Sequence, residues 1–144
     1  MRCNPTRTDI VALGLDNGRI FFLKLSTQEQ YLFDAHQHSA TMGADDLVPD
    51  YMKVEDMAWD PQEDNLIVSF ADKGMCLVSF QGFTDQTRVV KRFDEQPYAI
   101  NNIVWMTDRS GNFVTSNEKI GVLQYWNVAS NEPRQTNKIG SKGA

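Results

Sequence analysis

Val54-Glu55-Asp56-Met57-Ala58-Trp59-Asp60-Pro61 is the stretch of sequence that decides the fold of this protein. Two short runs follow it, residues 65–70 and 75–80, with the turn-forming sequence Asp72-Lys73-Gly74 between them. These runs are rich in apolar and β-branched residues and are bounded by Pro, Asn, Asp or Gly, which is typical of strands joined by tight turns. The stretch therefore predicts consecutive antiparallel strands.

The same pattern occurs three times along the chain. In each copy an anchor residue at the end of one strand precedes a turn glycine by nearly the same distance. The separations are 15, 15 and 16 residues for the pairs Cys3 and Gly18, Trp59 and Gly74, and Trp105 and Gly121. The glycine-to-glycine periods are 56 and 47 residues, somewhat longer than the roughly 40–45 residues of a four-stranded propeller blade. The surplus in the first interval indicates a loop insertion between blades.

Strand signals continue through the rest of the chain, and helix signals do not. Strand-like segments lie at residues 10–13, 20–25, 66–70, 75–80, 88–93 and 122–126. No window of eleven or more residues keeps the i, i+3, i+4, i+7 apolar spacing of an amphipathic helix. We therefore predict an all-β fold.

The composition excludes several classes of protein. The formal net charge of −5 and the pI near 4.9 disfavour nonspecific nucleic-acid binding, which depends on clustered Lys and Arg. The longest apolar stretch is far short of the roughly 20 residues that cross a bilayer as a helix, so we expect no membrane insertion. Cys3 and Cys76 show no Cys-x-x-Cys spacing, and no secretory signal is visible. These features favour reduced thiols in the cytoplasm.

The repeated segments carry a family resemblance. The strand ending in Ala58-Trp59-Asp60-Pro61, the Asp-x-Gly-type turn and the third strand ending at Trp126-Asn127 are similar to the WD repeat of β-propellers. In detail, residues 54–61, 102–105 and 120–128 resemble the middle repeats of the WD repeat-containing protein seventeen family. The resemblance implies a partial WD-repeat propeller of about two and a half to three four-stranded antiparallel blades.

The chain departs from the regular WD repeat in the polar residues that lock each blade. In that repeat a Gly-His pair, a Ser or Thr, a turn Asp and a closing Trp are joined by hydrogen bonds. Here Ala35-His36 is the only trace of the Gly-His pair, and the closing positions hold Leu23, Ser79 and Trp126. We therefore expect cohesion to depend mainly on apolar packing. The residues expected to provide it are Ile10, Leu13, Phe22, Ile67, Leu77 and Val122.

The strand and turn pattern also predicts the blade boundaries. We expect an incomplete first blade at residues 1–36, an insertion loop at 37–53, a second blade at 54–93, and a third blade at 94–144 that is incomplete at its outer strand. Trp59 and Trp105 stand at equivalent strand ends and should both be buried. Since closed propellers typically need four to eight blades, we expect a piece of a longer WD-repeat protein. Further blades or a neighbouring subunit would then cover both end faces.

The function that this architecture favours is a non-catalytic protein-interaction scaffold that needs no cofactor and whose partners are other proteins. Loops at the blade edges would present the contact residues. The candidates on predicted loops or strand ends are Asp45, Asp46, Tyr51, Arg88, Gln96, Tyr98 and Arg109. An alternative in the same class is a subunit of a ciliary or vesicle-trafficking assembly, because degenerate WD propellers are common in such complexes.

A small metal-binding enzyme is the alternative from a different class. His36 and His38 form a His-x-His pair near Asp45 and Asp46, and imidazole with carboxylate suits Zn²⁺. A structural histidine followed by a solvated loop explains the same residues without a metal. No Gly-x-Ser-x-Gly elbow or phosphate-binding loop supports catalysis. We therefore expect no metal site, and near-stoichiometric zinc in the purified protein would contradict this expectation.

Overall fold

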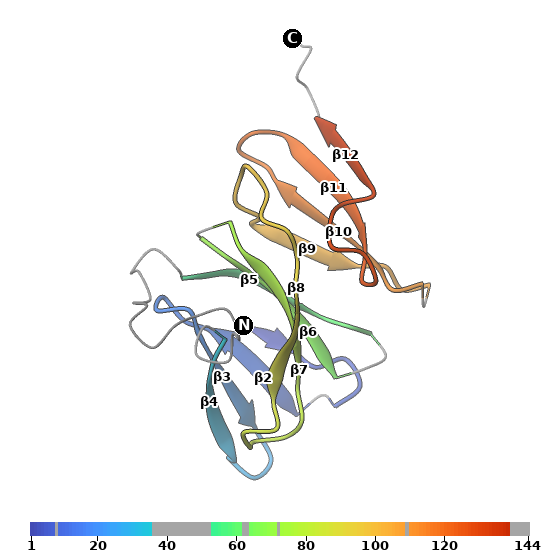
Figure 1. Cartoon of the computed structure of the whole chain (residues 1–144). Coiled ribbons are helices and arrows are strands. Elements are labelled where there is room, and N and C mark those ends of the chain that lie inside the picture. Colours follow the sequence, from blue (N-terminus) through green and yellow to red (C-terminus); the bar gives the residue numbers. More distant parts are fainter. Residues whose placement is uncertain (8, 36–52, 62–63, 72, 109, 139–144) are drawn as a thin grey trace.

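A computed structural model describes residues 1–7, 9–35, 53–61, 64–71, 73–108 and 110–138. Over these ranges the strands form three antiparallel sheets, and each sheet contains four strands that are consecutive in the sequence (Figure 1). Blade 1 comprises β1 (Arg2–Cys3), β2 (Ile10–Gly14), β3 (Arg19–Lys24) and β4 (Gln30–Asp34). Blade 2 comprises β5 (Val54–Trp59), β6 (Asn65–Phe70), β7 (Met75–Ser79) and β8 (Arg88–Arg92). Blade 3 comprises β9 (Asn102–Trp105), β10 (Asn112–Asn117), β11 (Val122–Asn127) and β12 (Gln135–Lys138).

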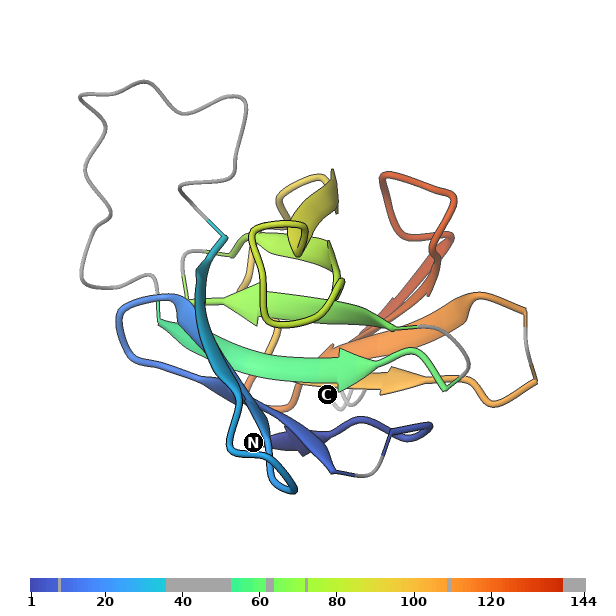
Figure 2. The same ribbon diagram turned by 90° about the horizontal axis from the view of Figure 1, so that it is seen from below.

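The blades stand side by side in chain order, with blade 2 between the other two (Figures 1 and 2). The first strands β1, β5 and β9 are neighbours and form the inner edge of the arc, while β4, β8 and β12 are the outer strands. The predicted all-β partial propeller of about three blades is confirmed. The insertion loop predicted at residues 37–53 lies, apart from Lys53, outside the described residues.

The third blade has an outer strand, β12, where the sequence predicted that this blade would be incomplete. β12 pairs with β11 from Lys138 opposite Val122 to Gln135 opposite Tyr125. All four residues of β12 are exposed, and the strand therefore shows no apolar alternation. Main-chain pairing with β11 forms it, and this pairing leaves no pattern in the side chains.

Two apolar clusters fill the spaces between the blades. The cluster between blades 1 and 2 includes Phe22, Phe33, Trp59, Leu66 and Val78. The cluster between blades 2 and 3 includes Ile67, Leu77, Ile103, Trp105 and Trp126. Successive residues of β6 alternate between the two clusters, so blade 2 is buried on both faces. This double burial explains why its strands read as continuous apolar runs.

The expected burial of the inner-strand tryptophans is confirmed, with Trp59 6% and Trp105 8% exposed. Each of them also reaches the inner strand of the preceding blade. Nε1 of Trp59 donates a hydrogen bond to the carbonyl oxygen of Arg2 at 3.2 Å, and Nε1 of Trp105 donates to that of Ala58 at 2.8 Å. The rings therefore contribute both apolar burial and a directional link between neighbouring blades.

Leu13 does not take part in the packing between blades, contrary to the sequence-based expectation. It is 40% exposed, whereas its neighbour Ala12 is fully buried. Because successive side chains of a strand point to opposite faces, Leu13 lies on the face of blade 1 that is turned away from blade 2. Ile10 and Phe22, which point toward blade 2, are buried as expected.

Asp56 links the inner strands of all three blades. It lies in β5 where the pairing with β6 is irregular. Its Oδ1 accepts hydrogen bonds from Nη2 of Arg2 and from the backbone N–H of Met57, both at 2.8 Å. Its Oδ2 accepts from the backbone N–H of Ile103 in β9, also at 2.8 Å. One carboxylate thus bridges blade 1 on one side and blade 3 on the other.

Part of the polar set typical of a WD repeat is present in blade 3. Nε1 of Trp126 donates to Oγ1 of Thr115 at 2.9 Å, and both residues are fully buried. A buried indole N–H needs such a partner because leaving it unpaired is costly. The pair therefore joins β10 to β11 through their side chains inside the cluster between blades 2 and 3.

The position equivalent to Trp126 in blade 2 is Val78, so the prediction of Ser79 is wrong by one residue. Trp126 and Val78 each lie, across the middle strand of the blade, in line with the tryptophan that ends the inner strand. The error arises at the turn before β7, where the prediction aligned Gly74 with the other turn glycines. The residue with the left-handed backbone conformation there is Lys73, with φ of 75°.

Candidate functional site

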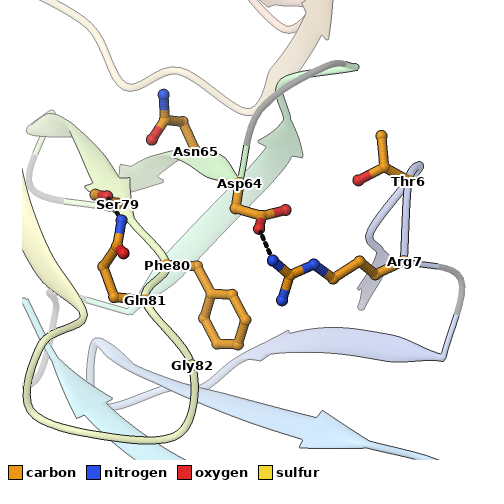
Figure 3. A pocket seen from close by; sticks show the side chains of 8 residues that line it. All are labelled: Thr6, Arg7, Asp64, Asn65, Ser79, Phe80, Gln81 and Gly82. Carbon is orange, nitrogen blue, oxygen red and sulfur yellow. Dashed lines mark hydrogen bonds and ion pairs between the residues drawn. The ribbon is translucent and has the colours of Figure 1, made fainter.

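A cleft of about 850 Å³ opens between blades 1 and 2 at one end of their sheets. Three chain segments converge on it, because the antiparallel strands bring the end of β1, the start of β6 and the end of β7 to the same side. The residues that line it are Thr6, Arg7, Asp64, Asn65, Ser79, Phe80, Gln81 and Gly82 (Figure 3).

Buried Asn4 fixes the wall that blade 1 contributes. Its Oδ1 accepts hydrogen bonds from the backbone N–H groups of Thr6 at 2.9 Å and Arg7 at 3.0 Å, and from the hydroxyl of Thr6 at 3.0 Å. Its Nδ2 donates to Oδ1 of Asp64 across the blade boundary at 3.1 Å. Asn side chains favour this type of turn because the amide oxygen replaces a backbone acceptor.

Arg7 and Asp64 form an ion pair across the mouth of the cleft. Nη2 of Arg7 lies 2.7 Å from Oδ2 of Asp64, and the two side chains are 55% and 22% exposed (Figure 3). Because the pair is solvated, it contributes little to stability. It does place one positive and one negative group beside each other, so the charge of the cleft is balanced and both charges are accessible.

Buried Thr87 fixes the wall that blade 2 contributes. Its Oγ1 accepts a hydrogen bond from the backbone N–H of Gln81 at 2.8 Å and donates to the carbonyl oxygen of Gly82 at 2.9 Å. Gly82 has a φ of 87°, a conformation that favours glycine. The Nε2 of Gln81 donates to Oγ of Ser79 at 2.7 Å. The connection between β7 and β8 is therefore held by internal hydrogen bonds.

Phe80 anchors the cleft in the apolar core. The residue is 2% exposed, and its ring centroid lies 4.8 Å from that of Phe22, 5.9 Å from that of Trp59 and 5.4 Å from that of Phe83. Its backbone N–H donates to the carbonyl oxygen of Asp64 at 2.8 Å. This packing ties the two connections of blade 2 to each other and to blade 1.

The chemistry of the cleft is that of recognition. Amide, hydroxyl and guanidinium groups offer donors, and amide, hydroxyl and carboxylate oxygens offer acceptors. The hydroxyl of Ser79 accepts a hydrogen bond from the Gln81 amide, which is not a base that could activate it for nucleophilic attack. Such a surface suits the backbone and polar side chains of a peptide segment.

Of the predicted contact residues, the structure describes Arg88, Gln96 and Tyr98, and none of these three lines the cleft. Arg88 lies nearest in register, because it starts β8 directly opposite Ser79, and its side chain is exposed. Gln96 and Tyr98 lie at the other end of blade 2, in the connection from β8 to β9. The Oε1 of Gln96 accepts a hydrogen bond from Nε2 of buried Gln124 at 2.8 Å, so it is part of the support for blade 3. Tyr98 is half-buried, and this burial raises the pKa of its hydroxyl.

The other predicted site residues lie outside the described residues. These are Asp45, Asp46, Tyr51 and Arg109, together with His36 and His38 of the proposed metal pair. Within the described part of the chain, no group of three or more His, Cys, Asp or Glu side chains is arranged to hold a metal ion. No helix within the described ranges is long and apolar enough to span a bilayer.

One sequence signal for the cleft was available. Asn4-Pro5-Thr6 is an Asn-initiated turn, and it marks an ordered connection after the anchor position Cys3. Asp64, which accepts a hydrogen bond from Asn4, and Gln81, which lines the same cleft, have no sequence signal of their own. They approach this turn only because blades 1 and 2 stack.

A solved structure described as "Crystal Structure of Mitotic Checkpoint Complex" contains a chain of similar fold. The two chains superpose with a TM-score of 0.72 at 13% sequence identity, over 96% of this chain. This chain spans 36% of the length of the other. At this identity the likeness shows the fold alone, that of a β-propeller. No protein-family model and no curated protein matches the sequence.

Proposed function

We propose that this chain is a non-catalytic protein-interaction module, part of a larger WD-repeat propeller that binds partner proteins at the cleft between blades 1 and 2. The observation that carries the proposal is the construction of the cleft walls. Each wall contains one buried polar side chain, Asn4 or Thr87, that forms hydrogen bonds with the loop backbone and so holds it in place. A surface fixed in this way loses little conformational entropy when a partner binds.

The partner chemistry follows from the groups on the walls. The cleft offers hydrogen-bond donors and acceptors and one balanced ion pair, and it exposes little apolar surface. A polar, extended peptide segment of another protein matches these groups, with a carboxylate to meet Arg7 or an amine to meet Asp64. Further blades or a neighbouring subunit would cover the two end faces of the arc, because repeat units depend on stacked neighbours.

The test compares the proteins that co-purify with the tagged chain and with two arginine variants. Gln81→Arg places a long charged side chain in the cleft. Gln86→Arg places the same side chain at an exposed position of the same connection that does not line the cleft. We expect partners held by the wild type to be retained by Gln86→Arg and reduced at least about tenfold by Gln81→Arg, which corresponds to about 1.4 kcal/mol. Equal recovery with both variants would contradict a binding role for the cleft.

A finer proposal places the propeller in the WD repeat-containing protein seventeen family and in a cytoplasmic ciliary or vesicle-trafficking assembly. It is supported by the resemblance of residues 54–61, 102–105 and 120–128 to the middle repeats of that family. Co-purification from ciliated and non-ciliated cells tests the ciliary role. Recovery of the same partners from both kinds of cell would count against it.

A further inference from the structure

The face of blade 3 that is turned away from blade 2 repeats the face of blade 2 that blade 3 covers. Strand pairing aligns the two faces without ambiguity. In blade 2 one row across the sheet is formed by Ala58, Ile67 and Leu77. In blade 3 the same row is formed by Val104, Val114 and Tyr125. Both rows lie one residue before the tryptophan that ends the inner strand.

The apolar side chains of this row are buried in blade 2 and accessible in blade 3. Ile67 is fully buried and Leu77 is 6% exposed, because blade 3 packs against them. Val104 is 61% exposed, and Val114 and Tyr125 are half-buried. The open face of blade 3, defined here as Val104, Val114, Tyr125 and their row neighbours Asn102, Ser116 and Leu123, is therefore an uncovered copy of a known interface.

The polar groups that join blade 2 to blade 3 also have counterparts on the open face. Asp56 accepts a hydrogen bond from the backbone N–H of Ile103, and Ser69 donates to the carbonyl oxygen of Ile100 at 2.8 Å. Asn102 occupies the register position of Asp56, and Ser116 occupies that of Ser69. The open face thus retains an acceptor and a donor where the covered face uses them.

A third hydrogen bond between neighbouring blades, donated by an indole N–H, indicates which residue type a blade that covers the open face must contain. At both interfaces within the chain, an indole N–H reaches the carbonyl oxygen of the residue that precedes the anchor position of the blade before it. These acceptors are Arg2 for Trp59 and Ala58 for Trp105. Val104 is the third member of this series. Its carbonyl group stands where the next indole would donate.

Resting on the proposed propeller function, we propose that the open face of blade 3 binds a further β-blade whose inner strand ends in a tryptophan. That indole donates to the carbonyl oxygen of Val104, and an inner-strand N–H two residues earlier donates to Asn102. The first blade of a second copy of this chain is a poor match. It holds Cys3 at the anchor position, and a thiol is only a weak donor.

Because Cys3 is a weak hydrogen-bond donor, replacing it allows the proposal to be tested by self-association of this chain. Cys3 is exposed, and Cys3→Trp gives the first blade the indole that it lacks. A second copy can then place this blade on the open face. In sedimentation velocity we expect Cys3→Trp to self-associate about tenfold more tightly than the wild type, the effect of one added hydrogen bond with ring burial. Cys3→Phe, which adds a ring without an N–H, should fall short of this gain.

Substitutions on the open face locate the contact. Val104→Asp in the Cys3→Trp chain should return it to the monomer, whereas Val90→Asp should not, because Val90 is a similarly exposed valine (48%) on the outer strand β8. Tyr125→Lys repeats the test at a second position of the face, and a cooperative thermal melt shows that each variant is folded. A closed ring and a longer head-to-tail assembly both support the proposal, since both use this face.

The proposal is overturned if the Cys3→Trp chain stays monomeric. It is also overturned if neither Val104→Asp nor Tyr125→Lys weakens the self-association of that chain. This result is separate from the test of the cleft, because the cleft lies between blades 1 and 2 and the open face belongs to blade 3.

Discussion

Removing the carboxylate of Asp56 should weaken the whole arc, because this one side chain bridges three blades. Asp56→Ala leaves the backbone N–H of Ile103 without its acceptor at the boundary between blades 2 and 3. It also removes the acceptor for Arg2 and for the N–H of Met57. The substitution creates no large cavity, so its cost arises mainly from lost hydrogen bonds.

The magnitude follows from the burial of each partner. A buried hydrogen bond to a charged acceptor contributes about 1.5–3 kcal/mol, and the carboxylate of Asp56 is only 11% exposed. The ion pair with Arg2 adds about 0–1 kcal/mol, because that guanidinium is 51% exposed. We therefore expect Asp56→Ala to lower the free energy of unfolding by about 2–4 kcal/mol. This is a large share of the about 5–15 kcal/mol typical of a folded domain.

Urea denaturation followed by circular dichroism measures this loss, with the dependence on denaturant unchanged if the native state stays compact. Arg2→Ala is the matched control. It removes the ion pair and leaves Ile103 satisfied, so it should cost no more than about 1 kcal/mol. Asp56→Asn, which keeps one acceptor oxygen, should fall between the two. A loss below about 0.5 kcal/mol for Asp56→Ala, or an equal loss for Arg2→Ala, would refute the bridging role.

Three further substitutions test the packing and the turns. Trp126→Phe removes the hydrogen bond to Thr115 and should cost about 2–3 kcal/mol by chemical denaturation; adding Thr115→Val should recover about 1 kcal/mol, and no recovery would show that the bond is unimportant. Lys73→Gly should raise the free energy of unfolding by about 0.5 kcal/mol, because glycine relieves the left-handed strain at a smaller entropic cost; a lower melting temperature would contradict this account. Gly14→Ala should cost about 1–3 kcal/mol, since its Cβ would collide with Cγ1 of Val54; a Val54→Ala background should reduce that cost, and strictly additive effects would argue against the contact.

Most of the architecture could be predicted from local features of the sequence. Alternation of apolar residues and turn-forming residues act over a few positions, so the strands of blade 2 and the threefold repeat could be read directly. Burial of Trp59 and Trp105 followed from their equivalent places in that repeat. The prediction failed at the turn before β7, where the sequence pattern could not fix the strand register to within one residue. Lys73 takes the left-handed position that the sequence assigned to Gly74, and the closing position moves from Ser79 to Val78 as a result.

The candidate site depended on tertiary structure almost entirely. Arg7 is far in the chain from Asp64 and Gln81. Pairing of β6 with β7 brings Asp64 and Gln81 to the same end of blade 2, and only the stacking of blade 1 on blade 2 adds Arg7 to the cleft. The predicted contact residue Gln96 instead supports Gln124, because a polar residue in a connection can be satisfied internally as readily as it can face a partner.

The sequence by itself determined that this protein is all-β, that it repeats a blade-like unit three times, and that two tryptophans anchor the inner strands. These properties arise from local backbone preferences and from the two-residue period of strands, which every segment expresses independently of its neighbours. Only the tertiary structure decided that β12 forms from Gln-Thr-Asn-Lys, that Asp56 bridges three blades, and that the cleft lies between blades 1 and 2. Those features depend on main-chain pairing and on blade stacking, which join residues distant in sequence and leave no periodic trace in it.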